Sequence, residues 1–209
     1  MSEGHVMAIK VVGIVGSYRK GRTIDSAVSA ILEGAKTKGA ETKKIYLLDR
    51  HIEFCRNCRS CVQEKTDKIR SKCVRNDNME EILREIDNAE GLVLAAPINF
   101  FNVTALMKRF IERLLPYCYW PWGKIIPKYR IKKKKMNKKA VTVTSSGCPA
   151  WLGRIIFSGA LSVLKTAARC MGARVVESLY FGTVCSSEDS QLSERALLKA
   201  RKAGEKLVC

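Results

Sequence analysis

Four cysteines that stand close together in the chain have a spacing suited to metal binding. Cys55, Cys58, Cys61 and Cys73 follow the pattern C-x2-C-x2-C-x11-C. Three thiolates at intervals of three can converge on one centre, and a more distant fourth can complete a ferredoxin-type [4Fe–4S] site. A zinc site has the same ligand count, although zinc sites usually use two separated pairs. The spacing leaves three interpretations open: an iron-sulfur cluster, zinc, or reduced cysteines without metal.

The remaining cysteines show no such spacing. The chain has nine cysteines, an odd number that cannot pair completely within one molecule. In a reducing compartment, thiols of this kind are buried apolar groups more often than disulfides. We therefore expect five of them to be buried or incidental: Cys118, Cys148, Cys170, Cys185 and Cys209.

A second group of chemically useful residues lies in the segment 16–23, which reads G-S-Y-R-K-G-R-T. It offers hydroxyl groups, glycines and cationic side chains directly before an expected helix. The amino end of a helix favours an anion. The segment matches neither the nucleoside-triphosphate loop nor the dinucleotide turn, so a monophosphate fits it better. The alternative is a polar turn with an ordinary helix cap.

Two further segments have residue types that suit a flat ring. Residues 96–104, A-P-I-N-F-F-N-V-T, interleave aromatic and amide side chains, which can lie against a heteroaromatic and hydrogen-bond its edge. The alternative is a turn capped by Asn102 or Thr104, with the phenylalanines in the core. Residues 144–147, T-S-S-G, add small polar groups.

The apolar pattern between these segments predicts the elements that position them. Short β-branched runs alternate with segments of helical periodicity, which is typical of a parallel sheet covered by helices on both faces. We therefore predict a three-layer, doubly wound α/β fold. The carboxyl ends of parallel strands share one edge, where the three loops would meet. The expected strands are 8–15, 45–48, 92–96, 140–144 and 175–181, and the expected helices are 23–39, 79–86, 105–115, 155–171 and a last one from about 191.

Length and composition set limits on the whole protein. The 209 residues, 46% of them hydrophobic and 28% charged, predict a single globular domain over 1–209. Two segments interrupt the alternation: a cysteine-containing loop at 49–76 and an aromatic and basic insertion at 116–139. No apolar run is long enough for a membrane helix, and the start does not read as a secretion signal, so we expect a cytoplasmic protein.

The three loops resemble those of a known family. GSYRKGRT, APINFFNVTALMKRFIERL and TSSG are similar to the NAD(P)H-dependent FMN reductase branch of the flavodoxin-like superfamily, and the similarity runs across nearly the whole chain. FCRNCRSC followed by CVRNDNM resembles the iron-sulfur flavoproteins, with a longer gap before Cys73. The resemblance implies a flavodoxin-like strand order 2-1-3-4-5, one FMN per subunit, and a homodimer or homotetramer whose interface lies near the flavins.

The resemblance also implies which residues hold FMN, although Asn99 stands where an aromatic residue is usual. The phosphate would be bound by Ser17, Arg19, Arg22 and Thr23. The isoalloxazine would be framed by Pro97, Ile98, Asn99, Phe100, Phe101, Asn102 and Val103, and the pocket closed by Ser145, Ser146 and Gly147.

The function expected from this resemblance is FMN-dependent electron transfer. Electrons would come from NAD(P)H or a reduced carrier and pass to a quinone, ferredoxin or an oxygen-derived oxidant, with a [4Fe–4S] cluster at the cysteines transferring single electrons. No catalytic side chain is expected because the chemistry belongs to the flavin. The alternative is a non-enzymatic module with a four-cysteine metal loop and a basic surface for nucleic acid.

The net charge is +18, and part of the basic excess is a lysine block formed by 132–135, 138 and 139. A solvated loop is the simplest interpretation. The other is attraction of an anion: NADPH, an acidic carrier such as ferredoxin, or nucleic acid. Nucleic acid is not expected, since no DNA- or RNA-binding signature is present. We expect the neighbouring aromatic residues to form a lid or subunit contact beside the flavin: Tyr117, Tyr119, Trp120 and Trp122.

Overall fold

A five-stranded parallel sheet forms the centre of the computed structural model, which describes residues 8–185 and 191–209. Its strand order is β2-β1-β3-β8-β9, which is the order 2-1-3-4-5 expected for a flavodoxin-like, doubly wound fold. The fold prediction is therefore confirmed. In chain order the strands are β1 Lys10–Val15, β2 Glu41–Tyr46, β3 Gly91–Ala95, β8 Lys138–Ser145 and β9 Ala173–Phe181.

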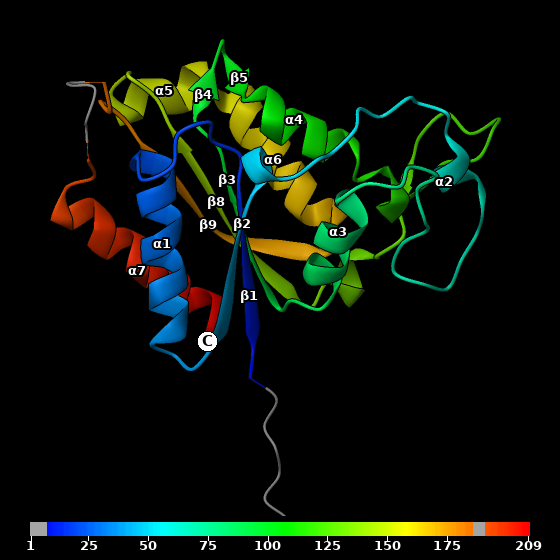
Figure 1. The fold of residues 1–209 in the computed structure, drawn as a ribbon, viewed down its shortest axis with the longest axis horizontal. Coiled ribbons are helices and arrows are strands. Elements are labelled where there is room, and N and C mark those ends of the chain that lie inside the picture. The colour runs from blue at the N-terminus through cyan, green and yellow to red at the C-terminus, as the bar shows by residue number, and fades with distance from the viewer. Residues whose placement is uncertain (1–7, 186–190) are drawn as a thin grey trace, which may run out of the picture.

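Helices cover both faces of this sheet (Figure 1). One face carries α1 Thr23–Lys36 and α7 Glu194–Val208, and the other carries α3 Met79–Asp87, α4 Ala105–Glu112 and α6 Ser158–Cys170. Among the described residues, every helix falls short of the length and apolar character that a bilayer-spanning segment requires. The minor elements are η1 Leu47–Asp49, α2 Ser60–Gln63, β4 Ile98–Asn99, β5 Asn102–Val103, η2 Leu115–Tyr117, β6 Cys118–Tyr119, β7 Lys128–Tyr129, η3 Lys133–Lys135 and α5 Ala150–Ile156.

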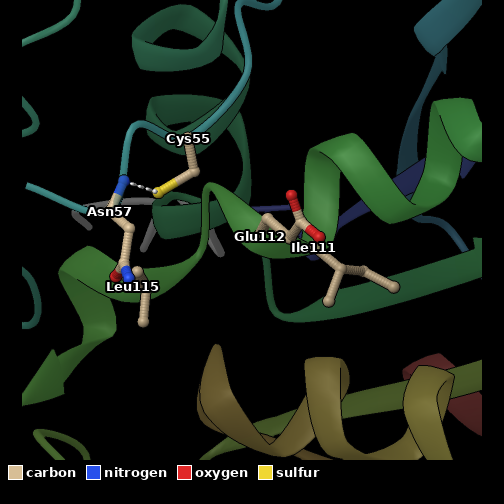
Figure 2. Close-up of a pocket in the computed structure, with 5 residues that line it drawn as sticks. All are labelled: Cys55, Asn57, Ile111, Glu112 and Leu115. Carbon is tan, nitrogen blue, oxygen red and sulfur yellow. Dashed lines mark hydrogen bonds between the residues drawn. The ribbon is translucent and has the colours of Figure 1, made fainter.

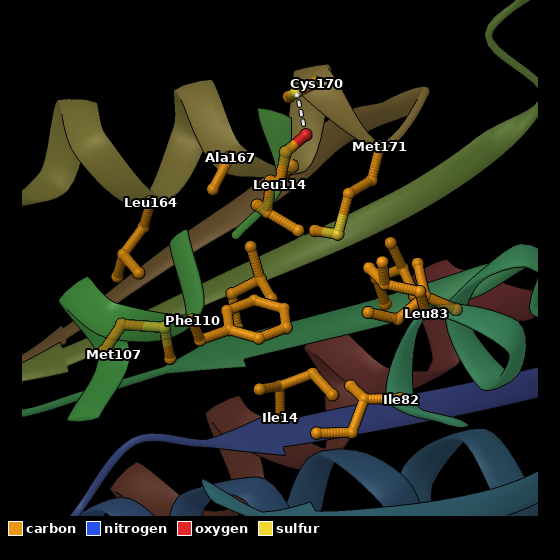
Figure 3. Close-up of a cluster of buried hydrophobic side chains, with 14 of the residues drawn as sticks. Ile14, Ile82, Leu83, Met107, Phe110, Leu114, Leu164, Ala167, Cys170 and Met171 are labelled. Atoms are coloured by element: carbon orange, nitrogen blue, oxygen red, sulfur yellow. Dashed lines mark hydrogen bonds between the residues drawn. The ribbon is translucent and has the colours of Figure 1, made fainter. Parts of the chain in front are cut away.

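The core is divided by the sheet into two layers. Val11 and Val15 of β1 pack with α1 and α7, whereas Val12 and Ile14 pack with the helices of the opposite face. All four side chains are at most 1% exposed, which explains why the strand reads as a continuous apolar run. Figure 3 shows the second layer, in which Phe110 of α4 lies between the sheet and α6.

Two expected elements differ from the structure. The predicted helix 155–171 is two helices, α5 and α6, which meet at Phe157. The helix breaks there because Phe157 packs against Tyr180 of β9 in a small separate cluster. The predicted strand 45–48 lies at 41–46. Its polar first half was missed because this edge strand uses Lys43 and Lys44 in ion pairs rather than apolar contacts. The other expected bounds agree within three residues.

The packing of α1 against α7 depends on two glycines. A Cβ at Gly34 of α1 would overlap the carbonyl of Arg201, and a Cβ at Gly204 of α7 would overlap the carbonyl of Ile31. Both glycines lie inside helices, where glycine is intrinsically unfavourable. Close approach of the two backbones is therefore the reason for glycine at these positions.

We predict that Gly204→Ala lowers the free energy of unfolding by about 1–3 kcal/mol, since the new methyl group must separate the helices. Urea unfolding followed by circular dichroism measures this. Gly159→Ala in α6 is the matched control, because its Cβ would meet nothing within 4 Å. The control should be stabilised by up to about 1 kcal/mol through helix propensity. Equal effects in the two variants would contradict the close-packing argument.

Candidate functional site

The three loops expected to hold a ligand do meet at one edge of the sheet. Val15, Ala95 and Val143 are register neighbours on β1, β3 and β8, so the loops that follow these strands start side by side. The Gly16 N–H donates to the Ala95 carbonyl at 2.8 Å. Adjacent strands lie about 4.8 Å apart, which places the three loop starts within about 10 Å of one another.

Thr104 fastens two of these loops together. Its hydroxyl donates to the carbonyl of Gly16 at 2.5 Å and accepts from the Met107 N–H at the start of α4. The side chain is fully buried. The sequence offered a cap by Asn102 or Thr104 only as the alternative to a ligand loop; the structure shows the Thr104 cap together with a bond to a loop 88 residues away. A pattern along one segment does not contain such a long-range contact.

The loop after β1 is shaped by hydrogen bonds within itself. The Ser17 hydroxyl accepts from the Arg19 N–H at 3.1 Å, and the Gly21 N–H donates to the Asp25 carboxylate at 2.6 Å. Gly21 has φ +71°, a conformation that glycine adopts without strain. Arg22 occupies the N-cap of α1, and the positive amino end of this helix lies next to the loop.

Asp25 is a site residue that the sequence did not indicate. It is 5% exposed and accepts hydrogen bonds from the Lys44 ammonium at 2.7 Å and the Tyr46 hydroxyl at 2.9 Å. Burial alone would raise its pKa, but the hydrogen bonds from Lys44, Gly21 and Tyr46 outweigh burial and lower it. The carboxylate therefore stays ionised and holds the loop in shape. An acidic residue in the first helical turn was the only signal in the sequence.

The aromatic loop expected after β3 is a tight hairpin. β4 and β5 pair antiparallel, and the turn between them consists of Phe100 at φ +41° and Phe101 at φ +65°. These left-handed conformations cost bulky residues about 1–3 kcal/mol each and are concentrated at functional sites. The two rings are 98% and 68% exposed. A strained turn that presents two aromatic rings to solvent indicates a surface for a ligand or partner.

The loop after β8, the third of the converging loops, is polar. The Ser146 hydroxyl lies 2.6 Å from the Tyr180 hydroxyl and accepts from the Cys148 N–H at 3.1 Å. Ser145 is buried beside it, and Gly147 is exposed. The Thr144 hydroxyl is buried without a hydrogen-bond partner in the described part of the chain. An unsatisfied buried hydroxyl at a ligand-binding edge is consistent with a group that binds there.

The structure therefore brings all predicted flavin-site residues to one edge, but it does not assign a contact to each. Asn99 and Asn102 are exposed opposite each other on the hairpin. Val103 is 5% exposed and packs in the core, which leaves its backbone as the part that can face a ligand. The individual roles stay predictions.

The four cysteines of the second site line a single cavity of about 410 Å³. Cys61 is buried, Cys58 is exposed, and Cys55 and Cys73 are half-buried. Burial raises the pKa of Cys61 to about 12, with further contributions from the other three thiols. In residues 8–185 and 191–209, no group of three or more metal-ligating side chains stands close enough to hold a metal ion as placed.

Arginines surround this cavity. Arg56, Arg59, Arg75 and Arg113 all contribute to its wall. The Arg113 guanidinium lies 3.7 Å from the Cys73 sulfur. Arg75 and Arg113 are paired with Glu53 and Asp77. Arg56 and Arg59 add positive charge to the wall, which suits a centre whose ligands carry negative charge.

Arg113 also determines where the cysteine segments lie. It forms an ion pair with Asp77 at 2.6 Å, with side chains 2% and 0% exposed, and donates to the Glu53 carbonyl at 2.8 Å. Glu53 precedes Cys55, and Asp77 follows Cys73. One buried guanidinium thus fixes the segments before the first and after the last cysteine to the end of α4. The sequence did not indicate this residue.

A second hollow, of about 360 Å³, connects Cys55 with α4. Figure 2 shows Cys55 beside the last turn of that helix, with the Asn57 N–H donating to its sulfur at 3.4 Å. α4 begins directly after Thr104, at the predicted flavin edge. Its eight residues span about 12 Å, so one short helix joins the two sites.

The aromatic insertion covers the cysteine loop and not the flavin edge. Arg59 lies between the rings of Trp120 and Trp122, at 4.1 and 4.0 Å from their centroids. The backbone N–H of Trp120 donates to the Val62 carbonyl at 2.8 Å. Tyr117 is fully buried and bonds to Asp87 at 2.6 Å. These residues pack on a distant segment and form no lid over the predicted flavin loops, whereas the subunit contact expected of them stays a prediction.

The lysine block lies at the opposite end of the sheet from the flavin loops. Lys138 and Lys139 begin β8, whereas the third flavin loop follows the end of this strand. Lys138 is not a solvated charge: its ammonium donates to the carbonyls of Ile86 at 3.0 Å and Asp87 at 2.7 Å. Burial lowers its pKa. The other members of the block, 132–135 and 139, are exposed or half-exposed.

Comparison with known proteins identifies related chains. A family model described as NADPH-dependent FMN reductase matches residues 9–184. An iron-sulfur flavoprotein of Archaeoglobus fulgidus is 34% identical over 113 residues, which cover 54% of this chain and 49% of that protein. An iron-sulfur flavoprotein of Methanosarcina thermophila is 32% identical over 105 residues, covering 50% of this chain and 52% of that protein. The chain spans about half the length of these curated relatives.

The fold has close counterparts among solved structures. An NAD(P)H:quinone oxidoreductase from Methanothermobacter marburgensis superposes with a TM-score of 0.73 at 18% sequence identity. The superposition covers 96% of this chain and 99% of that one. At this identity the likeness concerns the fold.

The buried ion pair leads to a prediction. We expect Asp77→Asn to lower the free energy of unfolding by about 3–5 kcal/mol, since it leaves the Arg113 charge buried without a counter-ion. Glu81→Gln, which disrupts an exposed pair with Arg50, is the control and should cost less than about 1 kcal/mol. Chemical unfolding at neutral pH measures both.

The same pair predicts a pH dependence. Burial would raise the pKa of Asp77, but hydrogen bonds from Arg113 and from the Glu53 and Met79 N–H groups lower it. A carboxyl whose folded pKa is depressed contributes stability above its unfolded value of about 3.9, and this contribution is lost as the pH falls through the folded value. The difference between the wild-type protein and Asp77→Asn should therefore shrink below about pH 4. A constant difference down to pH 2 would contradict the assignment.

Proposed function

This chain belongs to the NADPH-dependent FMN reductase family, and we propose on that basis that it is an FMN-dependent oxidoreductase. The observation that carries the proposal is the convergence of three loops at the carboxyl edge of the sheet, where the Thr104 hydroxyl joins two of them. Ligands of open parallel sheets bind at this edge. FMN would supply the redox chemistry, and the chain would hold and orient it.

The residues at this edge fit the parts of FMN. The positive end of α1 and the loop of Ser17, Arg19 and Thr23 suit a phosphate dianion. The hairpin of Phe100 and Phe101 offers apolar rings to a flat heterocycle. The chain would thus bind the charged end at one loop and exclude water from the ring at the other.

Electrons would enter from NAD(P)H or a reduced carrier and leave to a quinone, ferredoxin or an oxygen-derived oxidant. An acidic carrier could approach the cysteine cavity, whose wall carries Arg56, Arg59 and Arg75. We also propose a homodimer or homotetramer. Exposed apolar side chains on the hairpin and on the neighbouring α5, including Phe100, Trp151 and Ile155, form a surface that suits such a contact.

We propose in addition that the four cysteines hold a [4Fe–4S] cluster. All four thiols line one cavity, and the surrounding arginines balance the negative charge of a thiolate-bound cluster. The curated relatives named above are iron-sulfur flavoproteins. The cluster would pass single electrons between an outside carrier and the flavin, and α4 would determine the separation of the two centres.

The phosphate loop can be tested by substitution. Replacing Arg19 and Thr23 together by alanine should weaken FMN binding by at least about tenfold, because the proposal assigns both groups to the phosphate. Flavin fluorescence titration of the stripped protein measures this. Lys36→Ala, at the far end of the same helix, should leave the affinity unchanged. Full retention of FMN by the double variant, with the fold intact, would refute the loop assignment.

The cluster can be tested by metal analysis. Anaerobically purified protein should contain about four irons per chain, as a cysteine-ligated cluster requires. Cys73→Ser should lower the iron content and change the visible spectrum, whereas Cys209→Ser, at an exposed terminal cysteine, should not. Full iron content and an unchanged spectrum in Cys73→Ser would show that the proposed ligand set is wrong, and zinc in place of iron would exclude the cluster.

A further inference from the structure

A large cavity lies at the end of the sheet opposite the flavin loops. Its volume is about 1040 Å³, which is large enough for a nucleotide. It is formed by the insertion, by the last turn of α6 and by the start of β9. Arg174 at the start of β9 is seven residues from Phe181, which ends this strand. At about 3.3 Å per residue, the cavity is about 23 Å from the flavin edge.

The charge of this cavity has one sign. Five cationic side chains line it: Lys128, Lys132, Lys133, Arg169 and Arg174. Among the described residues that line it there is no carboxylate. None of the five forms a salt bridge with another described residue. Like charges around a concave surface repel one another and create a positive potential that attracts an anion.

The cationic residues that line this cavity differ in part from those of the lysine block. Lys134 and Lys135 belong to that block but do not line the cavity, whereas Arg169 and Arg174 come from elements remote in sequence. The tertiary structure thus combines two lysines of the block with cations from other elements. Arginine is well suited to phosphate because its planar guanidinium can form two parallel hydrogen bonds.

The cavity also has an apolar part. Ile131, Met136 and Val175 line it together with the ring of Tyr129. A ligand that uses both parts carries several negative charges at one end and a flat or apolar body at the other. Two phosphates carry about three to four negative charges, which five cations can balance. A nucleoside diphosphate has this combination.

We propose that this cavity binds a nucleoside diphosphate or a ligand with that moiety, through Arg169, Arg174 and the neighbouring lysines. The site is separate from the proposed flavin site. Because ADP could also enter an empty phosphate loop, the test uses protein loaded with FMN. Calorimetric titration with ADP at about 100 mM salt should show one binding event, and pyrophosphate should compete with it.

Two pairs of substitutions distinguish ADP binding in this cavity from long-range attraction by the positive surface. Arg169→Gln with Arg174→Gln should weaken ADP binding by at least about tenfold. Lys134→Gln with Lys135→Gln removes the same charge from the same region outside the lining and should weaken it less than about twofold. The Arg19 and Thr23 double variant, titrated in excess FMN, should still bind ADP, so failure of the flavin assignment would not affect this result. FMN content should be unchanged in both glutamine variants.

Three outcomes would overturn the proposal. The first is no ADP binding at moderate salt. The second is an equal loss of affinity in the two glutamine pairs, which would indicate only long-range attraction. The third is binding of polyglutamate or single-stranded DNA without binding of ADP, which would assign the cavity to an acidic protein or a nucleic acid.

Discussion

The buried ion pair between Arg113 and Asp77 is the interaction on which the second site depends. Both side chains are almost inaccessible to solvent, and each makes further bonds to the backbone or to a thiol of the cysteine segments. A buried charge must be paired, so neither residue can be lost without a large cost. Because Arg113 ends α4, the cysteine cavity is attached to the helix that starts at the flavin edge. The two proposed redox sites therefore have a fixed relation.

The flavin edge depends on a different constraint, the geometry of the parallel sheet. Parallel strands place their carboxyl ends at one edge of the sheet, so the three loops that follow them lie close together because of the strand arrangement itself. Thr104 and Asp25 then refine this arrangement, the first by joining two loops and the second by shaping the phosphate loop. The hairpin turn at the same edge has a strained backbone at Phe100 and Phe101. Both side chains are exposed, so a ligand or another subunit can cover them.

The two elaborations of the fold pack against each other rather than on the flavin edge. The aromatic part of the insertion encloses Arg59 of the cysteine loop, and Arg130 donates to the carbonyls of Cys61 at 3.3 Å and Glu64 at 2.9 Å. The basic part forms one wall of the distant cationic cavity. The insertion thus links the cysteine loop to the amino end of the sheet, and its basic part contributes to a cationic cavity separate from the arginines around the cysteines.

The sequence by itself determined the alternation of strands and helices around a parallel sheet and the two-sided burial of β1, because these follow from local periodicity and from the rule that parallel strands need crossover helices. The strand order was expected only from the resemblance of the loops to a known family. The sequence also identified the loops of the flavin edge and the cysteine spacing, since each is a contiguous segment. Only the tertiary structure decided that Arg113 holds the cysteine segments, that Trp120 covers them, and that Arg169 and Arg174 join the lysines. The physical reason is that these contacts join residues far apart in the chain, and side-chain charge and burial at such contacts depend on packing that no single segment encodes.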